Sequence, residues 1–279
     1  MRAAATDSHA RQQASGSSFY AGMRLLPKPE REAMFAIYAF AHAVDDIADE
    51  GDAKAAERKA ALDAWRQSIA SLYEGTPAGP GAFLAEPVRH YGLKKDDFLA
   101  LIDGMEMDLG VPICAPDLPT LDLYCDRVAS AVGRLSVKVF GMDEAPGIRL
   151  ACHLGWALQL TNILRDLDKD AQTGRLYLPR EYLQAAGIES REPHAVIAHP
   201  EINRACLLLA KLAHEHYKGA QAVLDARPRG LLRAPRLMGA VYGEILRKME
   251  RTGWAPPRTR VRIGRLRLLW IVLTRGLFA

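Results

Sequence analysis

Apolar residues recur along most of the chain at spacings of three and four, the periodicity of amphipathic α-helices, and strand-like alternation is nearly absent. Gly- and Pro-rich segments interrupt this pattern at 75–81, 111–116 and 255–257. The longer helices are predicted near 29–51, 54–74, 95–109, 119–141, 146–171, 200–226 and 230–252. Shorter helices are predicted near 81–91, 179–186 and 266–278. The chain is therefore predicted to be all-α, with a helical bundle at its centre.

The interruptions are too short to act as linkers, so we expect residues 1–279 to form a single domain. Residues 1–14 are polar and alanine-rich and are expected to be flexible. The sequence shows no secretory signal and no apolar run long enough for a membrane span, and its four cysteines lack disulfide or zinc spacing. We therefore expect a cytoplasmic protein.

Charge is distributed unevenly along the sequence. The net charge is only +4, too small by itself to suggest a nucleic-acid partner, but residues 226–279 carry +11 and residues 1–225 carry −7. Within the basic part, residues 258–279 mix arginines with apolar residues. This tail can lie on an anionic membrane surface, such as the inner face of the cell membrane, or pack on the body. The acidic body suggests an internal cation.

Polar residues continue the apolar faces of two predicted helices. The stripe on the first helix is Phe35, Tyr38, His42, Asp45 and Asp49, and the stripe on the second is Gly155, Gln159, Asn162, Asp166 and Asp170. Partly desolvated carboxylates that face one another repel unless a cation lies between them. Oxygen donors of this kind suit Mg²⁺, with Mn²⁺ as an alternative. The two stripes predict a site for a diphosphate with an apolar tail.

Other readings of these residues have less support. A single D-x-x-x-D is more often a solvated helix end, because carboxylates are mostly exposed. A di-iron bundle needs Glu-x-x-His pairs, which the sequence lacks. His214 and His216 are two residues apart on a helix and make a poor metal pair. The sequence also lacks the glycine-rich and nucleophile motifs of Rossmann, P-loop and serine-hydrolase proteins.

Several strings in the sequence resemble the squalene/phytoene synthase family, in family order from about residue 15 to 180. They are Ser17-Ser-Phe-Tyr20, Leu25-Leu-Pro27, Ala36-Ile-Tyr-Ala-Phe40, Asp45-Asp-Ile-Ala-Asp49, Gly104-Met-Glu-Met-Asp108, Tyr124-Cys-Asp-Arg-Val-Ala-Ser-Ala-Val-Gly133, Gln159-Leu-Thr-Asn-Ile-Leu-Arg-Asp166 and Gly174-Arg-Leu-Tyr-Leu-Pro179. Within the family, the likeness is strongest to bacterial members of hopanoid biosynthesis. The resemblance implies an isoprenoid-synthase helical bundle around a central apolar cavity.

The resemblance also implies roles for individual residues. The metal ligands would be Asp45, Asp49, Asn162, Asp166 and Asp170. The diphosphate contacts would be Ser17, Ser18, Tyr38, His42, Arg165 and Gln159. The catalytic residue would be Tyr124, and the substrate pocket would include Phe19, Ala129, Val132, Gly133 and Leu158. For Tyr124, whose helical stripe is apolar, core packing is the alternative interpretation.

One departure from the family pattern concerns the first stripe. The family usually has Cys-Arg where this chain has Ala41-His42. A histidine has fewer donors than a guanidinium and a charge that titrates near neutral pH, so one diphosphate contact differs in kind.

By resemblance, the reaction is a Mg²⁺-dependent prenyl transfer that joins two farnesyl diphosphates head to head, giving presqualene diphosphate and free diphosphate. NADPH is not expected. The alternatives are a phytoene synthase and a full, NADPH-dependent squalene synthase. An isoprenoid carrier without enzymatic activity is the alternative of a different class, since it would keep the apolar cavity but would not need two acidic walls. The oligomeric state cannot be read from the sequence.

Overall fold

The computed structural model describes residues 22–49, 54–110 and 112–271. Its first half contains the helices α3 (Lys28–Asp49), α4 (Ala55–Tyr73), α5 (Ala85–Tyr91), α6 (Lys95–Met107), α7 (Leu118–Cys125) and α8 (Ala131–Val139). Its second half contains α9 (Glu144–Arg165), α10 (Leu167–Gln172), α11 (Arg180–Ala185), α12 (Pro193–Ile197), α13 (Ile202–Asp225), α14 (Arg233–Thr252) and α15 (Arg265–Ile271). Between these described helices no strand forms, apart from one isolated bridge between Cys114 and Leu176. The prediction of an all-α protein is confirmed.

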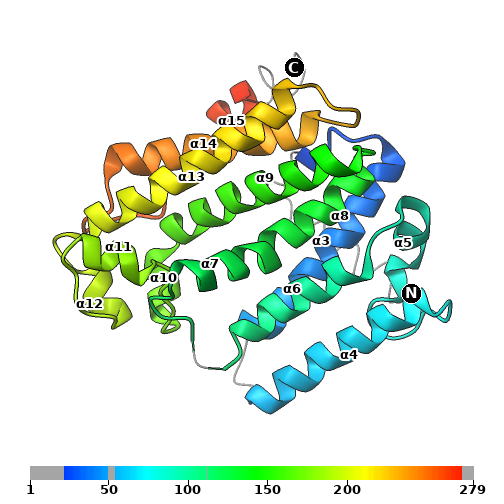
Figure 1. The fold of residues 1–279 in the computed structure, drawn as a ribbon, viewed down its shortest axis with the longest axis horizontal. Helices are drawn as coiled ribbons and strands as arrows, with labels where there is room; N and C mark the ends of the chain where they lie inside the picture. The colour runs from blue at the N-terminus through cyan, green and yellow to red at the C-terminus, as the bar shows by residue number, and fades with distance from the viewer. Residues whose placement is uncertain (1–21, 50–53, 111, 272–279) are drawn as a thin grey trace.

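Helix α9 crosses the middle of the bundle, with α13 on one side and α8 on the other, and α4 and α15 lie at opposite edges (Figure 1). The side chains of α9 contribute to two apolar clusters. Leu154 belongs to a cluster built around α3, α4 and α6, whereas Leu160 belongs to one built around α13 and α14. The central helix therefore connects the two halves of the core.

Two predicted helices are interrupted where they approach the centre. The prediction of one helix over 146–171 is wrong in this detail, because the backbone leaves helical geometry at Asp166 (φ −107°, ψ 15°) before α10 begins. The helix predicted near 119–141 contains a π-helical segment, Asp126–Ser130, between α7 and α8. Such π segments are frequent at functional sites. Local periodicity does not reveal either interruption, because apolar spacing continues through both.

The prediction that the cysteines are unpaired agrees with the structure, in which all four are free. Within the described part of the chain, no helix is both long enough and apolar enough to cross a membrane. The predicted flexible segment, residues 1–14, lies outside the described residues.

The π segment packs against α9 so closely that only glycine fits at position 155. A Cβ atom added to Gly155 would lie 2.9 Å from the backbone N of Ser130 and 3.0 Å from the carbonyl carbon of Ala129. These neighbours are backbone atoms, which cannot move aside as a flexible side chain would. By contrast, a Cβ on Gly239 of α14 would make only an ordinary contact of 3.5 Å with Leu154.

We expect Gly155→Ala to lower the free energy of unfolding by about 1–3 kcal/mol, because the added methyl group forces α9 and the π segment apart. The matched control, Gly239→Ala, should raise it by about 0.5–1 kcal/mol, because alanine is the better helix former. Urea denaturation followed by circular dichroism measures both. Equal stability of the two variants would contradict this account of the packing.

Candidate active site

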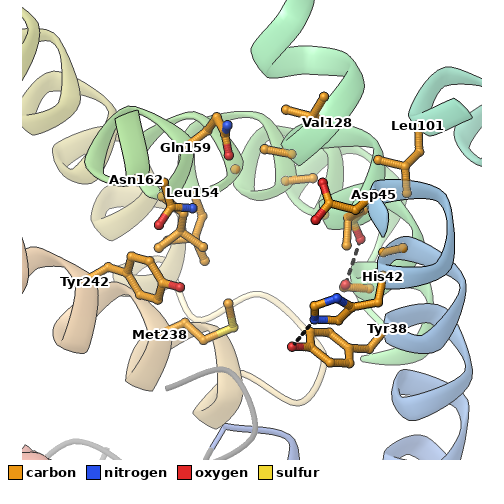
Figure 2. Close-up of a pocket in the computed structure, with 18 of the residues that line it drawn as sticks. Tyr38, His42, Asp45, Leu101, Val128, Leu154, Gln159, Asn162, Met238 and Tyr242 are labelled. Atoms are coloured by element: carbon orange, nitrogen blue, oxygen red, sulfur yellow. Dashed lines mark hydrogen bonds between the residues drawn. The ribbon is translucent and has the colours of Figure 1, made fainter. Parts of the chain in front are cut away.

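A cavity of about 440 Å³ opens between α3, α8, α9 and α14. Much of its lining is apolar, with side chains such as Leu101, Val128 and Leu154. Polar side chains face the cavity from α3 and from α9 (Figure 2). The predicted combination of an apolar interior and two polar walls is therefore present in the fold.

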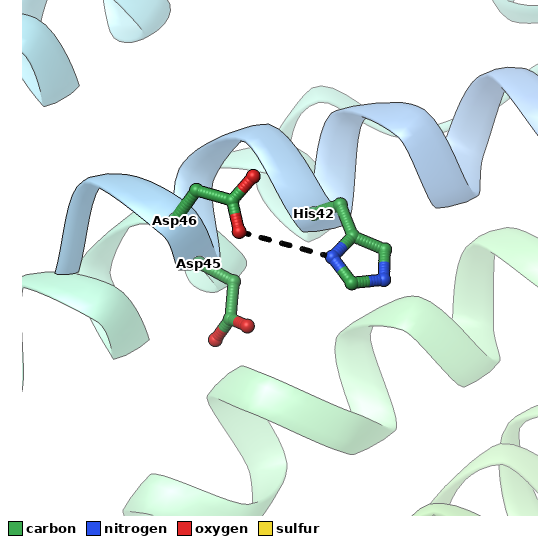
Figure 3. Close-up of side chains that lie close together, drawn as sticks. All are labelled: His42, Asp45 and Asp46. Atoms are coloured by element: carbon green, nitrogen blue, oxygen red, sulfur yellow. Dashed lines mark ion pairs between the residues drawn. The ribbon is translucent and has the colours of Figure 1, made fainter. Parts of the chain in front are cut away.

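The first polar wall comes from α3, where residues four apart lie on one face. The Nε2 atom of His42 lies 2.6 Å from the hydroxyl oxygen of Tyr38, and its Nδ1 atom lies 4.0 Å from a carboxylate oxygen of Asp46. His42, Asp45 and Asp46 each place a ligand atom within 4.8 Å of the others (Figure 3). Asp45 also faces the cavity, toward α9 (Figure 2). The α3 wall is thus a compact group of one imidazole and two carboxylates.

The second polar wall comes from the last turns of α9 and the start of α10. Gln159, Asn162, Asp166 and Asp170 all line the cavity. The Oδ1 atom of Asn162 is buried and has no hydrogen-bond partner among the described residues. A buried acceptor without a partner costs about 1–3 kcal/mol, so it needs an explanation in terms of a ligand or of function.

Asp166 is held by two guanidinium groups. Its carboxylate accepts hydrogen bonds from Arg165 at 3.1 and 2.9 Å, and from Arg260 at 2.6 and 3.0 Å. Burial opposes ionisation of Asp166, but these two arginines outweigh it and hold the pKa of the carboxyl below its usual value. Asp166 is therefore an anion in the folded protein, and Arg260 ties the basic C-terminal part of the chain to this wall.

Most of the residues that the sequence singled out are brought together around this one cavity. Those that line it are Tyr38, His42, Asp45, Tyr124, Ala129, Val132, Gly133, Leu158, Gln159, Asn162, Arg165, Asp166 and Asp170. Ser17, Ser18 and Phe19 lie outside the described residues. Asp49 is the last residue of α3, and its side chain is also outside the described part.

Three further cavity residues were not predicted as site residues. Asp108, Arg175 and Tyr177 line the cavity beside Tyr124. The Tyr124 hydroxyl donates to Oδ2 of Asp108 at 3.1 Å, and the Tyr177 hydroxyl donates to Oδ1 at 2.9 Å. The sequence did contain a signal for these residues. Asp108 ends the string Gly104–Asp108 and Tyr177 lies within the string Gly174–Pro179, and both strings resemble the family. Helical periodicity could not show that they meet.

Burial decides the ionisation of these phenols. Burial, reinforced by its neighbours Tyr177 and Asp108, raises the pKa of Tyr124 well above the usual tyrosine value of 10.0. Burial and the nearby Asp108 carboxylate likewise raise the pKa of Tyr177. Both side chains are therefore neutral phenols near neutral pH.

The donor set fits a hard divalent cation. Carboxylate and amide oxygens are the ligands Mg²⁺ prefers, and the buried, unpartnered Oδ1 of Asn162 is suited to this role. Each oxygen of the Asp166 carboxylate already accepts one hydrogen bond from Arg165 and one from Arg260, so Asp166 becomes a metal ligand only if one of these arginines moves aside. Asp45, Asn162, Asp166 and Asp170 all line the one cavity, so the oxygen donors that such a cation needs are present there.

A helical bundle with oxygen donors on two walls of an apolar cavity defines a class of enzyme that acts on isoprenoid diphosphates. The sequence places the chain within that class. Residues 12–267 match the squalene/phytoene synthase family model. The chain belongs to the squalene/phytoene synthase family.

Comparison with curated proteins shows high similarity over nearly the whole chain. The chain is 56% identical to presqualene diphosphate synthase of Zymomonas mobilis over 260 residues, covering 93% of this chain and 89% of that protein. It is 52% identical to the presqualene diphosphate synthase of Rhodopseudomonas palustris, covering 93% of each. Similarity to the phytoene synthase of Mycobacterium tuberculosis is lower, 38% over 62% of this chain and 57% of that protein.

Solved structures share the fold. A squalene synthase from Alicyclobacillus acidocaldarius superposes with a TM-score of 0.78 at 26% identity, covering 90% of this chain and 95% of that one. A dehydrosqualene synthase in complex with a ligand superposes with a TM-score of 0.82 at 23% identity, covering 96% and 94%, and its likeness bears on the fold alone.

We expect Asn162→Leu to separate stability from ligand binding. Leucine has a similar shape and removes the unpartnered acceptor, so the free energy of unfolding should stay unchanged or rise by up to about 1–3 kcal/mol. Binding of Mn²⁺ together with inorganic diphosphate, measured by calorimetry, should weaken at least about tenfold. A variant that loses stability but binds Mn²⁺ and diphosphate normally would contradict a ligand-binding role for this oxygen.

Proposed function

We propose that this protein joins two farnesyl diphosphates head to head to form presqualene diphosphate with release of diphosphate. The observation that carries the proposal is identity of 52–56% over about 93% of the chain to presqualene diphosphate synthases. The cavity agrees with this activity, since its polar walls suit diphosphates and its apolar interior suits isoprenoid chains. Similarity to phytoene synthases is lower and covers less of the chain, so that alternative has weaker support.

Each of the two polar walls would contribute ligands for the metal ions that bind the substrate diphosphates. Asp45 and Asp49 on α3 and Asn162, Asp166 and Asp170 on the α9 side would hold Mg²⁺, with Mn²⁺ as a possible replacement. When bound, such ions neutralise diphosphate charge and favour departure of the leaving group. Arg165 can bind phosphate oxygens bidentately, because a guanidinium presents paired donors and never deprotonates. Gln159, Tyr38 and His42 would add further hydrogen-bond contacts to the diphosphate, as would Ser17 and Ser18.

The apolar part of the cavity would direct the fate of the allylic cation. Ala129, Val132, Gly133 and Leu158 line it, and Phe19 is proposed to join them. Their surfaces exclude water, so the cation reacts with the double bond of the second substrate and not with a water molecule. Attack forms the first new carbon–carbon bond, and loss of a proton closes the cyclopropane. No step in this sequence requires a reductant, so NADPH is not expected.

The decisive experiment is incubation of the purified protein with farnesyl diphosphate and Mg²⁺, with and without NADPH. We expect presqualene diphosphate in both reactions, and its formation should stop when the metal is chelated. Squalene formed only with NADPH would show a full squalene synthase. Absence of any condensation product would contradict the proposed activity.

Replacing wall carboxylates separates an enzyme from an isoprenoid carrier. Asp45→Ala and Asp166→Ala should each reduce turnover by at least about 100-fold, because each removes a group that holds the cation. The control Asp225→Ala changes an exposed carboxylate at the end of α13 and should leave turnover unchanged. Wild-type protein that binds farnesyl chains without turning them over, together with folded Asp45→Ala and Asp166→Ala variants that keep this binding, would favour the carrier.

We further propose that the protein works in the cytoplasm and contacts an anionic membrane surface through its basic C-terminal part. In α15, Ile271 is buried, whereas Trp270 is 53% exposed and lies 4.5 Å from the guanidinium of Arg267. An exposed tryptophan beside arginine is suited to the interface between water and anionic lipid.

Sedimentation with phosphatidylglycerol vesicles tests this contact. Trp270→Ser should reduce the bound fraction at least about twofold, and binding should weaken with added salt. The control Leu207→Ser alters a similarly exposed apolar residue on α13 and should bind normally. Equal binding by both variants, or equal binding to uncharged phosphatidylcholine vesicles, would contradict the proposed surface.

A further inference from the structure

Asp108 is a buried carboxylate shared by two phenols. It follows α6 directly, Tyr124 belongs to α7, and Tyr177 lies in the segment between α10 and α11. The carboxylate oxygens accept one hydrogen bond from each hydroxyl, at 3.1 and 2.9 Å, and the two hydroxyl oxygens are 3.2 Å apart. The rings of Tyr124 and Tyr177 stack, with centroids 4.8 Å apart and planes inclined by 21°. Three separate parts of the chain thus converge on one carboxylate.

The surroundings hold this group in one arrangement. Asp108 is only 9% exposed, and the guanidinium Nε of Arg175 lies 3.9 Å from its Oδ1 atom. The backbone beside Tyr177 is fixed by two hydrogen bonds of 2.8 Å, from Ala115 N to Leu176 O and from Leu176 N to Ile113 O. A hydrogen-bonded, stacked and charge-compensated group of this kind has little freedom to rotate.

The direction of the hydrogen bonds determines what Tyr124 offers to the cavity. A phenol has a single hydrogen, and in Tyr124 the acceptors within reach of that hydrogen are Oδ2 of Asp108 at 3.1 Å and the hydroxyl oxygen of Tyr177 at 3.2 Å, which itself donates to Asp108. The hydroxyl is therefore a donor to the protein and not to a ligand. Donation to a carboxylate enriches the ring in electrons, and an aromatic face attracts a cation. Tyr124 lines the cavity, so a bound isoprenoid can contact the part of the ring that the stacked Tyr177 does not cover.

We infer that Asp108 and Tyr177 are positioning residues for Tyr124: they engage its hydroxyl hydrogen and fix its ring, so that the electron-rich ring stabilises the allylic cation. This inference rests on the proposed condensation. Tyr124 retains its proton, so the proton lost at ring closure passes to the released diphosphate. The electron pair of the broken C–H bond becomes the second cyclopropane bond. The high pKa of Tyr124 supports this assignment, since a phenolate does not form near neutral pH.

A double-mutant cycle tests whether Asp108 acts through Tyr124. Asp108→Asn should lower kcat for presqualene diphosphate by about 10- to 100-fold, with KM for farnesyl diphosphate changed less than about twofold. In the Tyr124→Phe background, the same substitution should lower kcat by less than about twofold further, because the hydroxyl through which it acts is absent. Farnesol and nerolidol, the alcohols formed when water captures the cation, should rise as a share of products.

The same double-mutant cycle can be measured with Tyr177→Phe in place of Asp108→Asn, and this substitution removes only one hydroxyl group. The test therefore remains possible if the Asp108→Asn variant does not fold. The matched control is Tyr217→Phe, which removes another buried hydroxyl, hydrogen-bonded to Thr161 at 3.0 Å on α9 but outside the cavity lining. It should leave kcat and the alcohol share unchanged.

The outcomes separate the inference from the activity on which it rests. Equal losses of kcat in the wild-type and Tyr124→Phe backgrounds would overturn the positioning role, as would a rise in KM without a fall in kcat. A Tyr217→Phe variant with the same alcohol share as Tyr177→Phe would also overturn it. Failure of the wild-type protein itself to condense farnesyl diphosphate would overturn both the proposed activity and this inference.

Discussion

Repulsion between carboxylates that line one apolar cavity is the constraint on which the rest of the structure depends. Asp45 on α3 and Asp166 and Asp170 near the end of α9 line the same space. Their negative charges oppose one another in a partly desolvated setting, so positive charge must be supplied by the protein or by a ligand. Arg165 and Arg260 supply some of it at Asp166. Asn162 lines the same space, and its Oδ1 atom has no hydrogen-bond partner among the described residues.

The helical scaffold holds these carboxylates around one cavity, where they can form a binding site. Helix α9 connects the two apolar clusters, so its polar end is held rigidly relative to α3. The close approach of Gly155 to the π segment brings Tyr124 and the small residues Ala129 and Gly133 to the cavity wall. Rigid walls matter for a reaction through a carbocation, because exclusion of water and fixed electrostatics must be in place before ionisation.

The basic C-terminal part of the chain also takes part in this electrostatic arrangement. The sequence left two possibilities for this stretch, contact with an anionic membrane surface or packing on the body. In the structure Arg258 pairs with Asp168 and Arg260 pairs with Asp166, so some of its charge is used within the protein. Arg267 of α15 likewise pairs with Glu244 of α14 and lies over the exposed Trp270. Much of the basic charge in the described part of this stretch is therefore balanced within the protein.

The amino-acid sequence by itself determined the helical class, the approximate helix ranges and the two stripes that end in Asp49 and Asp170. These depend on spacing along one helix, which is a local property. Only the tertiary structure decided what lies between elements: the break at Asp166, the π segment, the pairing of Asp166 with Arg260, and the meeting of Asp108, Tyr124 and Tyr177. Periodicity identifies the face a residue occupies but not its partner from a distant segment, because that partner is set by packing, burial and charge compensation in three dimensions.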